Sequence, residues 1–174
     1  MALPSSGQIS LADIASEFGG SAPHAMSEYY SKGNAAASGQ IRIAADFRGT
    51  EYVFGPLSHS YGQYSFDNSG GSYTMLTLTN LTKSSIRVYG NVYATNPSTS
   101  QIVLQRSSNN GSSWGSEVVI ASVVDTDHAN GTNSSSGDQT VSLSGFNAAR
   151  VLHRAINQHA WAATSASGVY VKFP

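Results

Sequence analysis

The segment 125–131 carries the residue types best suited to holding a metal ion. Asp125, Asp127 and Asn130 offer carboxylate and amide oxygens, which are the ligands that Ca²⁺ prefers. The spacing departs from that of an EF-hand loop, because Gly131 comes one position late and no acid stands at the twelfth position. The segment is therefore a weak metal candidate, a solvated polar loop is the favoured interpretation, and we expect no cofactor.

Histidines are a second source of binding chemistry. His153 and His159 lie close together in the sequence, and one interpretation is a polar binding face or a metal-binding cluster on a trimer axis. A histidine acts as a ligand or a pH switch only when suitable partners face it. Ordinary strand and turn histidines are therefore favoured. The full set is His24, His59, His128, His153 and His159.

Aromatic residues recur through the second part of the chain and offer a way to hold sugars. An aromatic ring can cover the apolar face of a sugar, but aromatic residues in strands more often fill the core or pair across strands. We single out Trp114 and Trp161 as the candidate glycan-binding residues. The other aromatic residues considered are Tyr52, Phe54, Tyr61, Tyr64, Phe66, Tyr73, Tyr89 and Tyr93.

The sequence contains few residues that could form a catalytic site. No nucleophile elbow, HExxH zinc motif, P-loop or dinucleotide-binding fingerprint occurs. A polysaccharide hydrolase would need two carboxylates roughly 5–10 Å apart in a groove. We expect the protein not to be an enzyme. The acids available for such a pair in the second part of the chain are Asp67, Glu117, Asp125, Asp127 and Asp138.

The composition is typical of a β-rich assembly protein. Only 11% of the 174 residues are charged, against roughly 25% in typical domains. The net charge of -1 leaves no basic patch for nucleic acid or a membrane surface, and no apolar run approaches the roughly 18 residues of a membrane span. The absence of cysteine excludes disulfides and thiol chemistry. With no secretory signal in view, we expect the protein to stay in a cytoplasm or to assemble there into something larger.

The first fifty residues are rich in alanine and predict short helices. Ser10 and Asp13 have the spacing of a capping-box variant, in which each side chain accepts a hydrogen bond from the backbone of the other residue. Ile9 and Ile14 then occupy the positions of a hydrophobic staple. These signals predict a helix over about 11–18.

Two more short helices are predicted, one from Pro23 to near Gly33 and one over about 43–47. The string SGQI at 6–9 recurs at 38–41, which indicates an internal repeat. An isolated helix below about 12 residues is marginal in water. The helices must therefore pack on each other, on the rest of the chain, or on another protein.

The three strings SGQISLADIASEFGG, HAMSEYYSKG and SGQIRIAADFRG, in that order, resemble a segment that recurs in virion and tail proteins of tailed bacteriophages. The match covers about residues 5–49. Arg42 stands where the family usually has a capping serine, and an extra alanine shifts Asp46 by one position. The resemblance implies a virion location, where homotrimers are expected of fibre-like proteins.

The rest of the chain alternates between polar and apolar residues with period two, which predicts strands. Asn110-Gly111 is a strong hairpin-turn signal, and 125–138 is predicted to be a long polar loop. Short strands at this spacing predict a mainly β fold, an antiparallel β-sandwich or jelly roll with a small N-terminal helical segment. The strands are predicted near 61–66, 73–80, 85–94, 101–106, 117–124, 139–144, 151–157, 159–164 and 168–173.

We therefore expect residues 1–50 to be a short-helix attachment segment and residues 51–174 to be a β-sandwich domain. The expected function is that of a structural component of a tailed-phage virion, in the tail, a fibre or the baseplate, assembled in the host cytoplasm. Two alternatives stay open, a receptor- or glycan-binding module of the tail and a capsid decoration or collar protein. The expected partners are other virion proteins and further copies of the chain, and a host surface glycan is the partner of the receptor-binding alternative.

Docking to neighbouring virion proteins is expected to use the apolar residues of the short helices. In a free chain such residues would make a larger apolar surface than soluble monomers usually expose. The residues concerned are Ile9, Leu11, Ile14, Phe18, Met26, Tyr29, Tyr30, Ile43 and Phe47.

Overall fold

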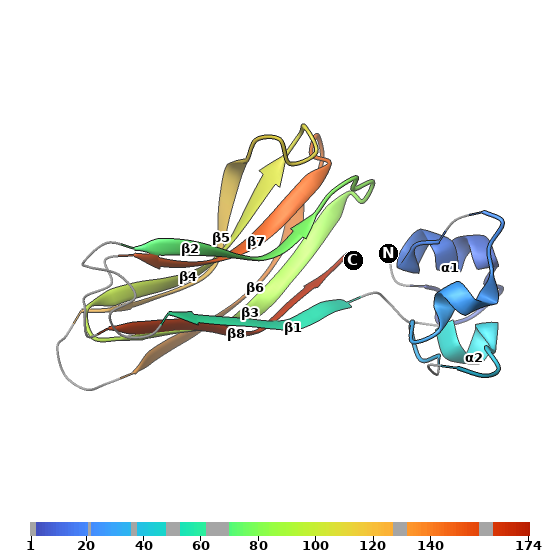
Figure 1. Cartoon of the computed structure of the whole chain (residues 1–174), viewed down its shortest axis with the longest axis horizontal. Coiled ribbons are helices and arrows are strands. Elements are labelled where there is room, and N and C mark those ends of the chain that lie inside the picture. The colour runs from blue at the N-terminus through green and yellow to red at the C-terminus, as the bar shows by residue number, and fades with distance from the viewer. Residues whose placement is uncertain are drawn as a thin grey trace. The chain divides into compact units, whose positions relative to one another are not determined.

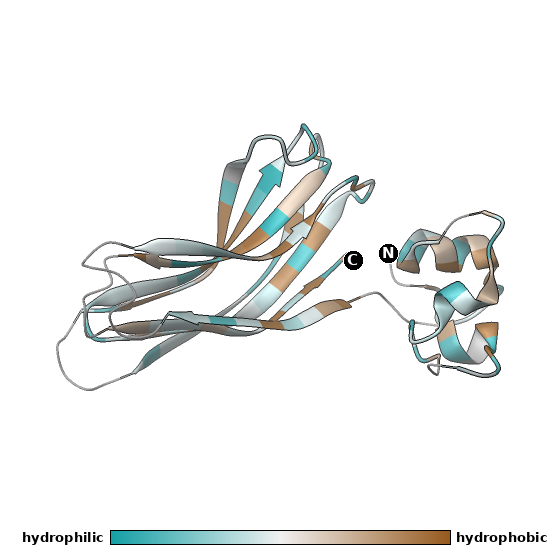
Figure 2. Ribbon diagram, viewed as in Figure 1, coloured by the Kyte–Doolittle hydropathy of each residue, from teal (hydrophilic) through white to brown (hydrophobic). Residues whose placement is uncertain are grey.

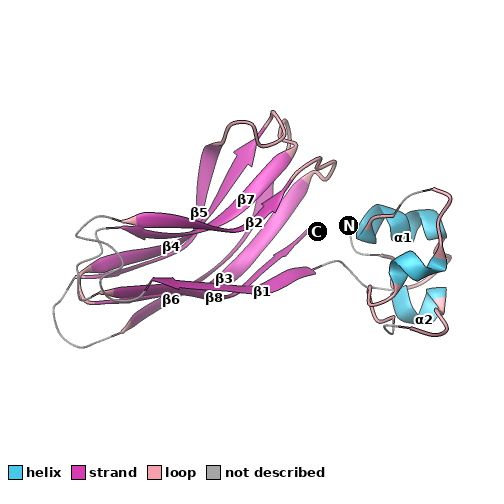
Figure 3. Ribbon diagram, in the orientation of Figure 1, coloured by secondary structure: helices cyan, strands magenta, loops and turns pink. Residues whose placement is uncertain are grey.

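The structure is a computed structural model that describes residues 3–20, 22–35, 38–47, 53–61, 70–126, 132–156 and 162–174. The chain divides into two compact units (Figure 1). The first contains Met1–Val53 together with Lys172–Pro174, and the second contains Phe54–Val171. Helices belong to the first unit, whereas the second is built of strands (Figure 3).

Helix α1 spans Leu11–Phe18 and confirms the predicted helix. Its capping box is present, because the Asp13 backbone N–H donates to Ser10 Oγ at 3.2 Å and the Ser10 backbone N–H donates to Asp13 Oδ2 at 2.8 Å. These bonds hold the pKa of the Asp13 carboxyl below its usual value. The helix ends at Gly19, whose φ of 79° lies in the region that favours glycine.

The second predicted helix is shorter than expected and of a different type. Only η1, Met26–Tyr29, is helical, and it is a 3₁₀ turn. Ala25 before it is extended, and its backbone N–H donates to Glu28 Oε1 at 3.3 Å, so the helix begins three residues after Pro23. Tyr30 returns to an extended conformation with ψ of 141°, which ends the turn before Gly33.

Helix α2 spans Ile43–Phe47, as predicted. No serine caps it, but Asp46 Oδ2 accepts a hydrogen bond from the Arg42 backbone N–H at 2.7 Å. The Arg42 guanidinium also lies 3.3 Å from Asp46 Oδ1. Asp46 is shifted by one position from the family pattern, but it still accepts a hydrogen bond from a backbone N–H at the start of the helix.

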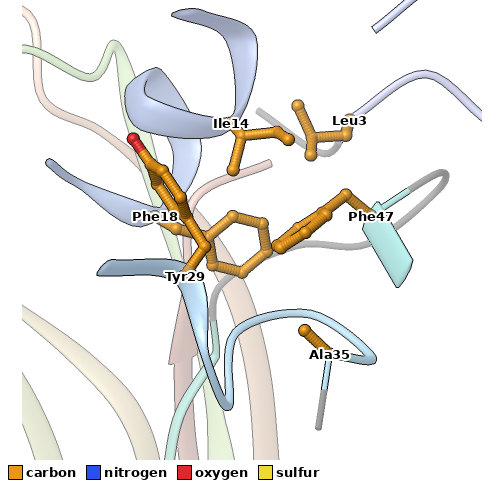
Figure 4. Packing of buried hydrophobic residues seen from close by; sticks show 6 residues of the cluster. All are labelled: Leu3, Ile14, Phe18, Tyr29, Ala35 and Phe47. Atoms are coloured by element: carbon orange, nitrogen blue, oxygen red, sulfur yellow. The ribbon is translucent and has the colours of Figure 1, made fainter. Parts of the chain in front are cut away.

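The three short helical elements share a small core of their own (Figure 4). Phe47 lies at the centre, with its ring centroid 5.7 Å from that of Phe18 and 6.3 Å from that of Tyr29, both edge to face. Burying each such side chain contributes about 1.5–3 kcal/mol, which is what lets helices of this length persist. The buried residues are Leu3, Ile14, Phe18, Tyr29, Ala35 and Phe47.

Among the described residues the second unit has eight strands, and the predicted mainly β fold is confirmed. Hydrophobic and hydrophilic bands alternate along several of them (Figure 2). The strands are β1 Val53–Tyr61, β2 Gly71–Leu78, β3 Ser85–Thr95, β4 Ser98–Ser107, β5 Gly115–Asp125, β6 Asn133–Ser142, β7 Ala148–Ile156 and β8 Ala163–Lys172.

Three strand predictions need correction. β1 ends where a strand over 61–66 was predicted to begin, and 62–66 lie outside the described residues. The predicted strands 159–164 and 168–173 are not separate, because β8 runs over Ala163–Lys172 and Gly168, with φ of 56°, shifts the in–out alternation without ending it. Residues 159–161 lie outside the described residues. The loop predicted over 125–138 is shorter, since β6 begins at Asn133 and its polar residues pair through their backbones with β3.

The strands form two antiparallel four-stranded sheets packed against each other, with orders β1-β8-β3-β6 and β2-β7-β4-β5. Consecutive strands lie in opposite sheets except for β4 and β5, which pair within one sheet, and this is the strand order of a jelly roll. In β3 every second residue faces the interior, and Val88, Val92 and Ala94 are fully buried. The residues between them face outward.

One side of the sandwich is closed by a close approach of β5 and β6. A Cβ atom on Gly137 would overlap the carbonyl oxygen of Ile120, so only glycine fits at this point of β6. Gln139 Nε2 donates to the carbonyl oxygens of Val119 and Ile120, at 2.8 and 3.3 Å. The Gln139 side chain therefore satisfies two carbonyls of the edge strand β5.

The predicted turn at Asn110-Gly111 is present. Both residues have positive φ, 56° and 88°, and the Ser112 backbone N–H donates to the Asn109 carbonyl at 3.2 Å. Positive φ at both central positions is the requirement of a type I′ turn. Asn110 also receives a hydrogen bond from Asn80 and donates one to Asn147, which ties three loops together.

A candidate ligand-binding groove on the outer face of one sheet

The outer face of the β1-β8-β3-β6 sheet carries tyrosine, asparagine and serine side chains in regular rows. On β3 the outward positions include Tyr89 and Asn91. The β3–β6 register places Tyr89 opposite Asp138 and Asn91 opposite Ser136. Polar and aromatic side chains of neighbouring strands are therefore brought side by side on one surface.

Two tyrosines of adjacent strands stack on this face. The rings of Tyr89 on β3 and Tyr170 on β8 have centroids 5.0 Å apart and planes inclined by 16°. Gly55 on β1 leaves room for this arrangement, because a Cβ atom there would lie 3.0 Å from Tyr170 Cδ1. The stacked pair forms an aromatic surface that spans the two strands.

An ion pair continues the row beyond Tyr89. Arg87 donates to both carboxylate oxygens of Asp138, with Nε–Oδ1 at 2.7 Å and Nη2–Oδ2 at 2.5 Å. The Arg87 guanidinium carbon also lies 5.9 Å from the centroid of the Tyr89 ring. Planar bidentate pairing fixes the orientation of both groups. The charges of Arg87 and Asp138 also cancel each other.

A hollow of about 430 Å³ lies beside this row. Its volume is in the range of small-molecule sites. Gly168, whose φ of 56° favours glycine, contributes a residue without a side chain to the lining. The lining includes Tyr89, Asn91, Ser136, Asp138, Gly168 and Tyr170.

A second hollow of about 410 Å³ lies farther along the same strand, with Tyr93, Thr95 and Ser165 in its lining. Tyr89 and Tyr93 are four residues apart on β3, a separation of roughly 13 Å along a strand. We call the two hollows together the β3 groove.

A chain of polar side chains crosses the interior of the sandwich near β1 and β2. His59 Nδ1 lies 3.0 Å from His153 Nδ1, and His153 Nε2 lies 3.0 Å from Ser100 Oγ. Ser100 donates to the Ser165 carbonyl at 3.1 Å. Because the Ser100 proton is used there, His153 Nε2 must donate to Ser100 and His153 Nδ1 must accept from His59.

This arrangement requires His153 to be neutral, because one of its ring nitrogens donates and the other accepts. Burial lowers the pKa of His153 to about 4, with a further contribution from the neighbouring His59. Burial also lowers the pKa of His59. Tyr73, which is 47% exposed, stacks on the His59 ring at 3.8 Å and covers the pair. Sequence reasoning treated His59 and His153 as unrelated, and their separation of 94 positions offers no local signal.

The predicted metal candidate is only partly within the described residues. Asp125 ends β5 and is buried, with 3% exposure, whereas Asp127 and Asn130 lie outside the described residues. In the part of the chain that the structure describes, no group of three or more histidine, aspartate, glutamate or cysteine side chains is placed to hold a metal ion. The loop interpretation stays a prediction.

Trp114 does not lie in the β3 groove. Its ring is covered by the Arg150 guanidinium, whose carbon lies 4.7 Å from the ring centroid, and it packs beside Gly111 of the turn. Trp161 lies outside the described residues. Tyr89 and Tyr93 were among the aromatic residues considered from sequence, but Tyr170 was not. The period-two alternation of β8 was the signal that places it on the outer face.

The described acids of the second unit are separated and mostly paired. Glu117 on β5 receives hydrogen bonds from Arg154 at 3.0 and 2.5 Å and one from Gln105, which together lower its pKa. Asp138 belongs to the opposite sheet and pairs with Arg87. Asp67 and Asp127 lie outside the described residues. The expectation that the protein is not an enzyme stays a prediction.

Four of the nine predicted docking residues are buried in the core of the first unit. Ile14, Tyr29 and Phe47 are fully buried and Phe18 is 9% exposed, so the expectation that they form an exposed surface is wrong. They are buried because the short helices pack on one another. The remaining five, all at least partly exposed, are Ile9, Leu11, Met26, Tyr30 and Ile43.

Comparisons with known proteins find similarity in fold alone. The sequence matches no protein-family model and no curated protein. The structure resembles chains of the infectious bursal disease virus VP2 subviral particle (TM-score 0.48, 8% identity, 78% of this chain and 37% of that one) and of the Gx strain of that virus (0.47, 14%, 70% and 32%). The chain thus spans about a third of those chains. No helix among the described residues is long and apolar enough to cross a membrane.

Proposed function

We propose that this chain is a structural component of a viral particle, in the tail, a fibre or the baseplate of a tailed phage, with residues 1–50 as its attachment segment. The observation that carries the proposal is the first unit, in which the three phage-like strings fold around one shared core. Fold-level analogy adds modest support, since jelly rolls occur in viral capsid and lectin domains.

The attachment surface consists of the predicted docking residues that are not buried in the small core of the first unit. Met26 is 36% exposed at the start of η1, and Tyr30 at its end is partly exposed with its hydroxyl donating to the Gly39 carbonyl at 2.8 Å. Ile9, Leu11 and Ile43 pack on the core from its rim. A folded unit with an apolar rim docks as a rigid body, so attachment needs no folding on contact.

The test compares two substitutions in the same turn of the full-length chain. Met26→Asp puts a charge on the proposed docking surface, whereas Ser27→Asp puts the same charge on the exposed neighbouring position. The amount of each variant in purified particles is measured beside its melting temperature. We expect a severalfold loss of incorporation for Met26→Asp alone, with both variants folded. Incorporation of both at the level of the unsubstituted chain would contradict the proposal.

Closed assembly of several copies belongs to the same proposal, since most oligomers have closed symmetry and a trimer is the expectation for a fibre-like protein. Light scattering of the purified chain measures the copy number directly. A capsid decoration or collar position stays an alternative, which partner identity in the particle would distinguish.

A second candidate function, a receptor- or glycan-binding module, is favoured by a specific observation. The stacked Tyr89–Tyr170 pair stands beside a bidentate Arg87–Asp138 pair and the Asn91 amide, on a concave surface. This combination offers aromatic surface and oriented polar groups in one place.

A further inference from the structure

We propose that the β3 groove binds a neutral, linear oligosaccharide lying along β3. The inference concerns a site on the second unit and does not depend on the virion role proposed for the chain. It names the residues and the chemical class of ligand that the glycan-binding alternative leaves open.

The charge of the lining indicates a neutral ligand. Asp138 is the charged residue in the lining of the first hollow, and Arg87 holds both of its carboxylate oxygens. An anionic ligand would meet this carboxylate, while a cationic ligand would compete with a guanidinium already in place. A neutral ligand meets neither penalty, because it leaves the pair intact.

The polar groups of the lining suit a ligand rich in hydroxyls. Asn91 offers both a donor and an acceptor, and Ser136 opposite it offers a hydroxyl that can do either. A carboxylate already bonded to arginine still has lone pairs available for hydroxyl donors. The phenol groups of Tyr89 and Tyr170 add amphipathic surface against which the C–H groups of a sugar can pack.

The shape of the groove favours a chain over a single sugar or a protein. Two hollows of similar volume, about 430 and 410 Å³, follow each other along β3. A protein interface of standard size would bury about 800 Å² on each partner around a fully buried apolar centre. Beside its two tyrosine rings this face carries an amide, hydroxyl groups and an ion pair, and a protein partner would have to desolvate these polar groups.

The experiment uses the full-length chain and a defined set of probes. These are the neutral hexasaccharides of glucose, mannose, galactose and N-acetylglucosamine, with hexagalacturonate as the acidic comparison, measured by saturation-transfer NMR and calorimetry. We expect binding of at least one neutral hexasaccharide and none of the acidic one. Binding of the acidic probe, alone or beside a neutral one, or binding of no probe, would overturn the inference.

Matched substitutions locate the site. Ser136→Phe fills the first hollow, and Thr140→Phe places the same ring on the same face of β6, opposite Arg87 and outside the lining. We expect Ser136→Phe to weaken binding by at least about tenfold, equivalent to about 1.4 kcal/mol, and Thr140→Phe to leave it within about twofold. Asn91→Ala removes the amide and should weaken binding by about fivefold, as expected for one hydrogen bond.

Each result decides the question. Equal weakening by Ser136→Phe and Thr140→Phe, or full binding by Ser136→Phe, would place the ligand elsewhere and overturn the inference. Melting temperatures of the three variants near that of the unsubstituted chain keep loss of binding separate from loss of the fold. Because particle incorporation is not measured here, this outcome is independent of the attachment proposal.

Discussion

The histidine pair between the sheets predicts that the second unit loses stability in mild acid. His153 is fully buried and accepts a hydrogen bond from His59, so a proton on His153 Nδ1 would set two N–H groups against each other. The groups that face it are His59, Tyr61 and Ser100, with Tyr73 stacked outside His59. None of them carries a negative charge near neutral pH, because burial raises the pKa of Tyr61. A protonated His153 therefore has no compensating partner.

The magnitude follows from the two pKa values. His153 has its ordinary pKa of 6.5 in the unfolded chain and about 4 in the folded one. The unfolded state thus binds the proton more readily, so stability is complete above about pH 6.5 and falls as the pH drops toward 4. With about 1.4 kcal/mol per pKa unit, the full loss is about 3 kcal/mol, of which about 2 kcal/mol is reached near pH 5.

The assay is chemical denaturation followed by tryptophan fluorescence near pH 7.5 and near pH 5. Trp114 and Trp161 both lie in the second unit, so the signal reports on that unit. His153→Gln should lower the free energy of unfolding near pH 7.5. Its free energy of unfolding should then change little between pH 7.5 and pH 5. His24→Gln, in the first unit, should keep the whole drop. A pH dependence of the same size in His153→Gln would refute the reasoning.

Three further predictions test other parts of the account. Gly111→Val should destabilise the second unit by about 1–3 kcal/mol because φ of 88° is strained for a β-branched residue. Ser112→Val is the control. Equal melting temperatures of the two variants would show that the turn does not depend on glycine. Gly137→Ala should cost about 1–3 kcal/mol through overlap with the Ile120 carbonyl, whereas Gly115→Ala, with no atom within 4 Å of its Cβ position, should be nearly neutral; calorimetric melting compares the two. A chain of residues 51–174 should stay folded by circular dichroism yet fail to enter particles, and its normal incorporation would defeat the attachment role.

Local features of the structure were predictable because their causes are local. The capping box of Ser10 and Asp13 fixes the start of α1, and Asn110-Gly111 adopts the positive φ values that its residue types tolerate. In each case the interacting groups are at most three residues apart in the sequence. Period two likewise identified β3, predicted over 85–94 and observed over Ser85–Thr95.

Features that depend on which strands become neighbours were not predictable in this way. Tyr89 stacks on Tyr170, 81 positions later, only because the jelly-roll order puts β8 beside β3. His59 reaches His153 for a similar reason, with β1 in one sheet and β7 in the other. The burial of Phe18, Tyr29 and Phe47 within one small core depends on contacts between short helices, which the helix signals themselves do not contain.

The most direct test of the virion role is a cryo-EM map of intact particles from cells in which this chain is produced with the rest of its genome. We predict density for the jelly roll at the particle surface or around a symmetry axis, with the first unit seated on a neighbouring protein through the side of η1 that carries Met26. Absence of the chain from the particles, or a first unit that contacts no neighbour while the jelly roll makes every contact, would contradict the account.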